Sequence, residues 1–241
     1  MNKTLQGKKV VVLGGTSGIG LATAEAAIAH GAEVVVTSSQ ERNVAAAVHA
    51  LGGAAAGQVA NLLEESEIRA LFERIGELDH LVFTAGESLT LGRLEATDLA
   101  PARQAYELRV FGAMAAAKHA AKRIRAGGSI TLTHGIAGQH PQAGWTIAAS
   151  ICGAMEAFTR ALAVELAPIR VNAVSPGFVR SPLWSNIPEA EREQMYRDAG
   201  KQLLVGRVGE PPEIAAAYLH LIESGFSSGQ TIVVDGGGLL C

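Results

Sequence analysis

Cysteine and aromatic residues are scarce in this chain of 241 residues. Its only cysteines are Cys152 and Cys241, and aromatic side chains make up 5% of the sequence. The two cysteines are far apart and form no C-x-x-C or metal-ligand spacing, so we expect neither a structural disulfide nor a metal site, as in a reducing compartment. With 48% hydrophobic residues, one large core is expected, built mostly from Ala, Val, Leu and Ile.

The sequence also lacks a charge excess and a signal-like start. The formal net charge is -3, and no basic stripe alternates with aromatic residues, so nucleic acid is not expected as a partner. Residues 1–9 lead directly into a strand pattern, and no apolar run approaches the roughly 20 residues that a membrane span needs. We therefore expect a cytoplasmic protein without a membrane partner.

Strand and helix patterns alternate along the whole chain, and no linker or repeat divides it. The strand-like runs are short, uninterrupted and β-branched, which is typical of parallel strands covered on both faces. The pattern predicts one α/β domain over 1–241, a Rossmann-type doubly wound parallel sheet. The predicted strands are 9–13, 33–37, 58–60, 80–84, 128–134, 170–175 and 231–235, and the predicted helices are 18–30, 42–51, 65–75, 101–125, 148–167 and one that begins at Pro211.

Residues 183–203 interrupt this alternation. A segment rich in large apolar side chains, 183–188, leads into a charged amphipathic stretch at 189–201. Ligands of open α/β sheets bind at the carboxyl ends of the strands. We therefore predict that 183–203 is a substrate lid over that edge of the sheet.

Glycines cluster where the first predicted strand meets the first predicted helix, in the sequence LGGTSGIG that begins at Leu13. Glycine lets the backbone turn sharply and lets its N–H groups approach a pyrophosphate at the positive end of the helix. The segment therefore predicts a dinucleotide-phosphate cradle. Its candidate binding residues are Gly14, Thr16, Ser17, Gly18, Ile19 and Gly20.

The end of the second predicted strand indicates which dinucleotide binds. A site for the unphosphorylated cofactor usually places Asp or Glu there, about 20 residues beyond the cradle, to accept the ribose hydroxyls. This chain has Ser38 at that position, followed by Ser39 and Arg42, with Glu41 as an opposing charge. Because no carboxylate at 38 repels a 2′-phosphate, NADP(H) is favoured over NAD(H).

Four blocks of the sequence resemble the short-chain dehydrogenase/reductase family, and the resemblance covers essentially the whole chain. They are the glycine cradle, residues 84–86 (TAG), residues 172–177 (NAVSPG) with Ser181, and the C-terminal segments 206–213 and 229–237. The C-terminal block implies a homotetramer or dimer. Further cofactor-binding residues implied by the resemblance are Asn61, at the position that touches adenine, Ala85 and Gly86 beside the adenosine half, and Pro176, Gly177, Val179 and Ser181 near the nicotinamide.

Catalysis in that family rests on an Asn, a Ser, a Tyr and a Lys, and this chain has other residues at the matching positions. The register of residues 157–166 places Ala148 at the Tyr position and Cys152 at the Lys position. The preceding strand places Gly135 at the Ser position, with the family's own spacing to residue 148. Arg109 stands where the Asn is expected.

A shift of register restores none of these groups, because no Tyr lies between 106 and 196 and no Lys between 122 and 201. Moving the pKa of a Tyr from about 10 towards neutrality takes roughly 4 kcal/mol of local electrostatics, and neither Ala148 nor Cys152 supplies it. The loss of a general acid alone lowers a rate by about two to four powers of ten. Standard carbonyl reduction is therefore expected to be near background.

Three hypotheses of function follow. The leading one is a family member that still binds a nicotinamide dinucleotide and a small molecule, with a binding, regulatory or repurposed role. The second is an active NADP-dependent oxidoreductase with a non-standard proton donor, in which Arg109, His134 or the substrate handles the proton, as in hydride addition to an activated double bond. The third is a non-catalytic subunit of a hetero-oligomer with an active paralogue.

Three residues near the replaced positions each allow a functional and a structural interpretation. Arg109 either clamps an anionic ligand, as a guanidinium fork suits, or pairs with Glu107 or Glu156. His134 is either a replacement acid or base or a hydrogen-bonded core histidine. Cys152 fits a buried, inert thiol better than a nucleophile.

Overall fold

The computed structural model describes residues 4–89 and 91–241. Residues 1–3, the beginning of the stretch expected to lead into the first strand, lie outside the described part, as does residue 90. Seven parallel strands form one sheet in the order β3-β2-β1-β4-β5-β6-β7. From β1 the chain adds β2 and β3 on one side, and it then adds β4 to β7 on the other side of β1. The sheet is therefore doubly wound, as predicted. The strands are β1 (Lys9–Leu13), β2 (Glu33–Ser38), β3 (Ala55–Val59), β4 (Leu78–Phe83), β5 (Ile124–Thr133), β6 (Arg170–Pro176) and β7 (Thr231–Val234).

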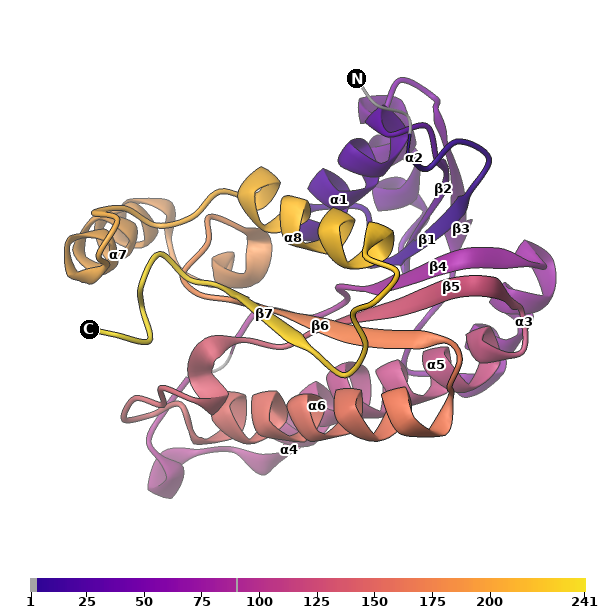
Figure 1. Ribbon diagram of the computed structural model, residues 1–241. Coiled ribbons are helices and arrows are strands. Elements are labelled where there is room, and N and C mark those ends of the chain that lie inside the picture. Colours follow the sequence, from indigo (N-terminus) through magenta and orange to yellow (C-terminus); the bar gives the residue numbers. More distant parts are fainter. Residues whose placement is uncertain (1–3, 90) are drawn as a thin grey trace.

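Helices cover both faces of the sheet (Figure 1). Side chains alternate along a strand, so Val10 and Val12 pack on one face of β1 and Val11 and Leu13 on the other. All four are fully buried. The first face carries α1 (Gly18–Ala29), α2 (Glu41–Ala50) and α8 (Pro211–Glu223), and the second carries α3 (Glu65–Ile75), α5 (Ala113–Ala121) and α6 (Thr146–Glu165).

Three predicted elements differ most from the structure: the long central helix, the third strand, and the fifth strand, which begins at Ile124 rather than at 128. The helix predicted at 101–125 is divided into α4 (Leu99–Tyr106), a π-helical segment η2 (Glu107–Gly112) and α5. It starts earlier because the Asp98 carboxylate accepts a hydrogen bond from the Ala100 N–H, and it ends at Ala121 because β5 begins at Ile124. The third strand is Ala55–Val59 rather than 58–60, since pairing with β2 overrides its weak Ala- and Gly-rich strand signal.

The expectation that no apolar segment reaches the length of a membrane span is wrong for one helix. By length and composition α6 is long and apolar enough, with 20 residues and a mean hydropathy of 1.4. Core helices pass the same test, and α6 buries Ala148, Ile151, Met155 and Leu162 against the sheet. Only 28% of this apolar stretch is buried, so much of its surface faces outward.

The segment predicted as a lid contains a short 3-10 helix, η4 (Pro182–Trp184), and α7 (Glu189–Gln202). In Figure 1, α7 stands apart from both helix layers. The segment has a separate apolar cluster of its own, in which Trp184 and Tyr196 are buried together with Leu203 and Val208. We call it the lid cluster. Two further short 3-10 helices are η1 (Leu94–Ala96) and η3 (Ile136–Gly138).

Candidate active site

The cradle after β1 admits only glycine at two positions. A Cβ on Gly14, whose φ is 82°, would lie 2.6 Å from the Cα of Ala85. A Cβ on Gly20 would lie 2.3 Å from the Gly14 carbonyl oxygen and 2.5 Å from the Thr84 hydroxyl oxygen. That hydroxyl donates to the carbonyls of Leu13 and Gly14, at 3.1 and 3.3 Å. The turn is thus packed against the end of β4, which brings the first two family blocks together.

The N-terminus of α1 faces the segment after β6. The N-cap residue Ser17 makes no side-chain cap hydrogen bond, and the first N–H groups of a helix have no partner within it. A Cβ on Gly18 would lie 2.9 Å from Pro182 Cδ and 3.5 Å from Ser181 Cβ. The helix end therefore has no side-chain cap from its N-cap residue, and Ser181 and Pro182 lie directly beside it. This arrangement fits a dinucleotide pyrophosphate.

The predicted adenosine-side residues lie at the ends of β2 and β3. Ser38 closes β2, and its hydroxyl accepts a hydrogen bond from the Gln40 N–H at 3.3 Å. Arg42 is exposed, and its Nε donates to the Gln40 side-chain oxygen at 2.9 Å. Asn61 uses its amide oxygen to accept the Leu63 N–H at 3.2 Å, which leaves one lone pair of that oxygen for an adenine amino group.

The remaining predicted cofactor residues follow β6. Pro176 ends that strand, and the Gly177 N–H donates to the Val234 carbonyl at 3.0 Å. A Cβ on Gly177 would lie 2.8 Å from Asp235 Cα, so this block is packed against the C-terminal segment. Val179 is buried in the core, and its carbonyl accepts the Trp184 indole N–H at 3.2 Å. The Val179 carbonyl therefore already has a partner within the protein.

The positions matched to the family's Ser, Tyr and Lys come together at the carboxyl end of β5. Ala148 and Cys152 lie one turn apart on α6, and a Cβ on Gly135 would lie 3.5 Å from the Cys152 sulfur and 3.7 Å from the Pro176 carbonyl oxygen. Burial raises the pKa of the Cys152 thiol, against the lowering effect of the Gly135 backbone and the Arg109 charge. The thiol is therefore protonated near neutral pH, as the inert interpretation expects.

Arg109 lies in the π-helical segment η2 and reaches the end of β4. Its Nε is 3.3 Å from the Glu87 carboxylate, and its guanidinium also donates to the Glu87 carbonyl. A Cβ on Gly86 would lie 2.6 Å from a guanidinium nitrogen, so the group packs directly on that glycine. The predicted partners Glu107 and Glu156 were wrong. Glu87 was missed, although its position directly after the TAG block placed a charge at the site.

His134 is a hydrogen-bonded core histidine in this structure. Its Nδ1 is 3.3 Å from the Gly135 carbonyl and its Nε2 is 3.3 Å from the Thr231 hydroxyl. Burial lowers the pKa of the imidazole, so a neutral ring donates through one nitrogen and accepts the hydroxyl proton through the other. Both nitrogens are occupied, which disfavours His134 as a proton donor to a ligand.

The lid segment is joined to the loop that carries Glu87. The Ser88 and Ser185 hydroxyls are 2.9 Å apart, and the Leu89 N–H donates to the Leu183 carbonyl at 3.2 Å. Trp145, which precedes Ala148 on the chain, packs on the lid cluster with its ring 5.7 Å from that of Phe178. The predicted lid segment is therefore attached to the loop that carries Glu87, the partner of Arg109, with apolar rings at its edge.

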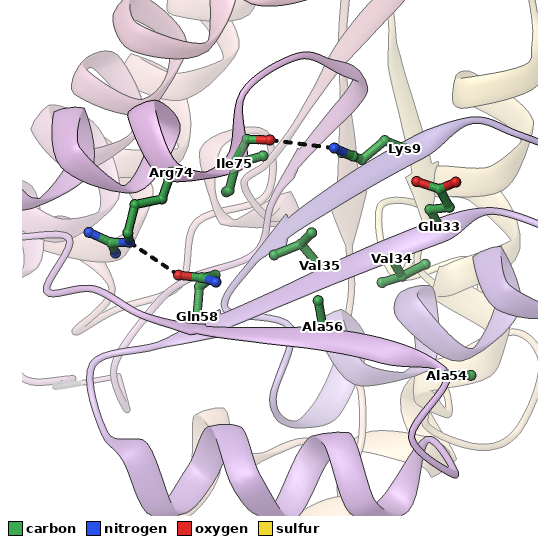
Figure 2. Close-up of a pocket in the computed structure, with 9 residues that line it drawn as sticks. All are labelled: Lys9, Glu33, Val34, Val35, Ala54, Ala56, Gln58, Arg74 and Ile75. Atoms are coloured by element: carbon green, nitrogen blue, oxygen red, sulfur yellow. Dashed lines mark hydrogen bonds between the residues drawn. The ribbon is translucent and has the colours of Figure 1, made fainter.

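The hollow in Figure 2 is a different place on the molecule. Its volume is about 340 Å³, and it lies between α3 and the face of β1 to β3, lined by Lys9, Glu33, Gln58 and Arg74 among others. The Arg74 Nε donates to the Gln58 side-chain oxygen across it at 3.2 Å. None of the predicted site residues lines this hollow. It is therefore not the candidate active site.

Comparison with known proteins agrees with this geometry. The family model described as enoyl-(acyl carrier protein) reductase matches residues 14–238. The short-chain dehydrogenase/reductase fsr5 of Gibberella fujikuroi is 35% identical over 254 residues, covering 98% of this chain and 96% of the relative. The short-chain dehydrogenase/reductase ucsE of an Acremonium species is 36% identical over 258 residues, covering 98% and 97%. The chain therefore belongs to the short-chain dehydrogenase/reductase family of oxidoreductases.

Solved structures of the same fold extend the comparison. A small-chain dehydrogenase in complex with NADPH superposes with a TM-score of 0.86 at 38% identity, covering 97% of this chain and 99% of the other. The MalC reductase/Diels-Alderase of Malbranchea aurantiaca superposes with a TM-score of 0.92 at 29% identity, covering 99% of both. The single-domain Rossmann-type fold predicted from the sequence is confirmed.

Proposed function

We propose that this protein is an NADPH-dependent reductase in which the Arg109 guanidinium takes the place of the family's Tyr and Lys. The observation that carries the proposal is the position of Arg109, held on Gly86 at the carboxyl end of β4 and close enough for its charge to act on the Cys152 thiol. The names of the relatives as reductases favour an active enzyme over a purely binding or regulatory role. Ala148 on α6 and Gly135 after β5, at the family's Tyr and Ser positions, provide no acid.

The residues around the cradle fit a nicotinamide dinucleotide. Gly14 and Gly20 let the turn after β1 pack closely against the end of β4, and α1 begins at this turn with its N-terminus. Ser38 and Arg42 favour the 2′-phosphate, and the NADPH complex of a structural neighbour supports that choice. A reduced nicotinamide bound in this site supplies hydride to the substrate.

The chemistry of Arg109 favours one class of substrate. A guanidinium remains charged in proteins, so it donates hydrogen bonds to a developing oxyanion without giving up a proton. An alkoxide is too basic to be left in that state. Hydride addition to the β-carbon of an α,β-unsaturated carbonyl compound instead moves the C=C electron pair into the bond between the α-carbon and the carbonyl carbon, and the C=O π pair onto oxygen. The resulting enolate takes a proton from water at the α-carbon. Conjugate reduction therefore needs no tyrosine.

This function is tested by deuterium transfer. NADPH labelled with deuterium at the transferred position is incubated with the protein and with paired substrates, cyclohexenones and the matching saturated ketones. Mass spectrometry measures the products. We expect one deuterium at the β-carbon of the reduced enone and near-background conversion of the saturated ketone. Equal conversion of both, or transfer to neither, would contradict the proposal.

We also infer a homotetramer or dimer. The support is α6, of whose apolar stretch only 28% is buried and on which Val164 has a relative exposure of 82%. An apolar face left open on one helix favours association. Light scattering at micromolar concentration is expected to return a multiple of the 24.9 kDa chain mass, and a monomer would overturn the inference.

A further inference from the structure

A carboxylate beside Arg109 changes what the guanidinium can recognise. Glu87 approaches the Nε of Arg109 to 3.3 Å, and its backbone carbonyl accepts a second guanidinium hydrogen bond. An unpaired guanidinium is a strong binder of carboxylates and phosphates. Here its charge is matched by an opposite charge of the protein, so the pair presents no net charge to a ligand.

The pair is a fixed part of the site. The relative exposures of the Arg109 and Glu87 side chains are 22% and 37%, and the guanidinium lies on Gly86 with no space for a Cβ between them. The chain next to Glu87 is fixed as well, because the Leu89 N–H donates to the Leu183 carbonyl at 3.2 Å. Glu87 therefore holds the guanidinium from two atoms of one anchored residue.

The second carboxylate oxygen of Glu87 has no partner. Oε2 is buried and makes no hydrogen bond within the described residues, 4–89 and 91–241. A buried acceptor without a donor is unfavourable, and the Glu87 side chain as a whole is part-exposed, so a ligand whose N–H or O–H group reaches this carboxylate gains relative to one that brings none. Arg109 supplies donors and Glu87 an acceptor at the same point.

From this arrangement we propose that Glu87 is a specificity-determining residue that makes the site select neutral substrates carrying a carbonyl oxygen next to an N–H or O–H donor, and reject carboxylates. This selection of neutral substrates replaces the expectation that Arg109 binds an anionic ligand. The proposal rests on the proposed function only in taking the surroundings of Arg109 as the substrate site.

Binding of three phenyl compounds tests the proposal without relying on turnover. Benzamide offers a carbonyl and an N–H donor, acetophenone offers the carbonyl alone, and benzoate is the anionic isostere of benzamide. Each is titrated by calorimetry into the protein saturated with NADP⁺. We expect the wild type to bind benzamide most tightly and benzoate most weakly.

The substitution Glu87→Gln removes the negative charge and keeps the shape. We expect benzoate to bind about tenfold tighter to this variant and acetophenone to change less than twofold; water screening of a part-exposed pair limits the gain. Glu73→Gln, on the exposed surface of α3, makes the same change in net charge and is expected to alter none of the three affinities. Adding Arg109→Met to Glu87→Gln is expected to abolish the gain.

The outcomes separate this proposal from the proposed function. If benzoate binds Glu87→Gln no better than the wild type, or if the wild type prefers benzoate, the role of Glu87 is refuted even where deuterium transfer succeeds. If the expected affinity pattern holds but no enone is reduced, the reductase proposal fails and the selectivity of the pocket stands. Thermal unfolding of each variant identifies any that has lost its fold.

Discussion

Restoring the family's reacting groups is expected to give the protein the carbonyl reduction that it lacks. The substitutions are Gly135→Ser, Ala148→Tyr and Cys152→Lys, introduced singly and together. The structure accommodates the serine, because Gly135 has an extended backbone with φ of -163° and its Cβ would make ordinary contacts at 3.5 and 3.7 Å. The new phenol and ammonium would lie one helical turn apart on α6.

The magnitude follows from what each group supplies. Lowering the pKa of the new phenol by about three units requires roughly 4 kcal/mol, and the new ammonium is the group that provides much of it. A working general acid is worth about two to four powers of ten. We therefore expect the triple variant to reduce reactive saturated ketones about 10²-fold faster than the wild type, and each single variant to gain almost nothing.

Arg109 opposes this gain, because its charge lowers the pKa of a lysine placed at Cys152 and occupies the position of the family's Asn. Adding Arg109→Asn to the triple variant is expected to raise the rate further. NADPH oxidation is followed by absorbance, with thermal unfolding as the control for a buried, unpaired ammonium. A wild type that already reduces saturated ketones at roughly 1 per second, or a single substitution that alone restores the rate, would refute the loss of the family's acid at these positions.

Two further predictions concern the cofactor and the core. Arg42→Ala is expected to weaken NADPH binding about tenfold and NADH binding less than twofold, with Arg69→Ala on α3 as control; equal losses for both cofactors in a fluorescence titration would reject the 2′-phosphate role. Burial lowers the pKa of His80 to about 4 from 6.5, so the unfolded chain takes up a proton between these values that the folded chain does not. The contribution of the neutral His80 to the free energy of unfolding is therefore fully present above pH 6.5 and is lost as the pH falls towards 4. Denaturant unfolding at pH 7 and 4.5 should show the wild type losing about 2 kcal/mol more than His80→Asn, and equal losses would contradict the shift.

Much of the fold could be predicted from the sequence because its signals are local. The β-branched run at 9–13 gave β1 with its correct bounds, and Gly31, with φ of 92°, ends the first helix region as its left-handed preference requires. The third strand was shifted because residues 55–57 carry no local strand signal, and only the neighbouring β2 makes them a strand.

The site was predictable in its backbone and not in its side-chain pairing. The glycines of the cradle and the position of Arg109 follow from motifs. The contact between Arg109 and Glu87 joins residues 22 positions apart on different elements, and nothing in the sequence specifies that the π-helical segment turns the guanidinium towards the end of β4. The same holds for the lid, whose attachment at Leu183 depends on the loop after β4.

The role of Arg109 is tested most directly by replacing it with methionine, which keeps its bulk without the charge, and with lysine, which keeps the charge without the fork. With the enone that the deuterium experiment identifies, we expect Arg109→Met to lower kcat at least 10²-fold, the usual effect of removing an oxyanion donor, while NADPH affinity changes less than twofold. Arg109→Lys should retain an intermediate rate. A methionine variant that reduces the enone within threefold of the wild-type kcat would contradict the account.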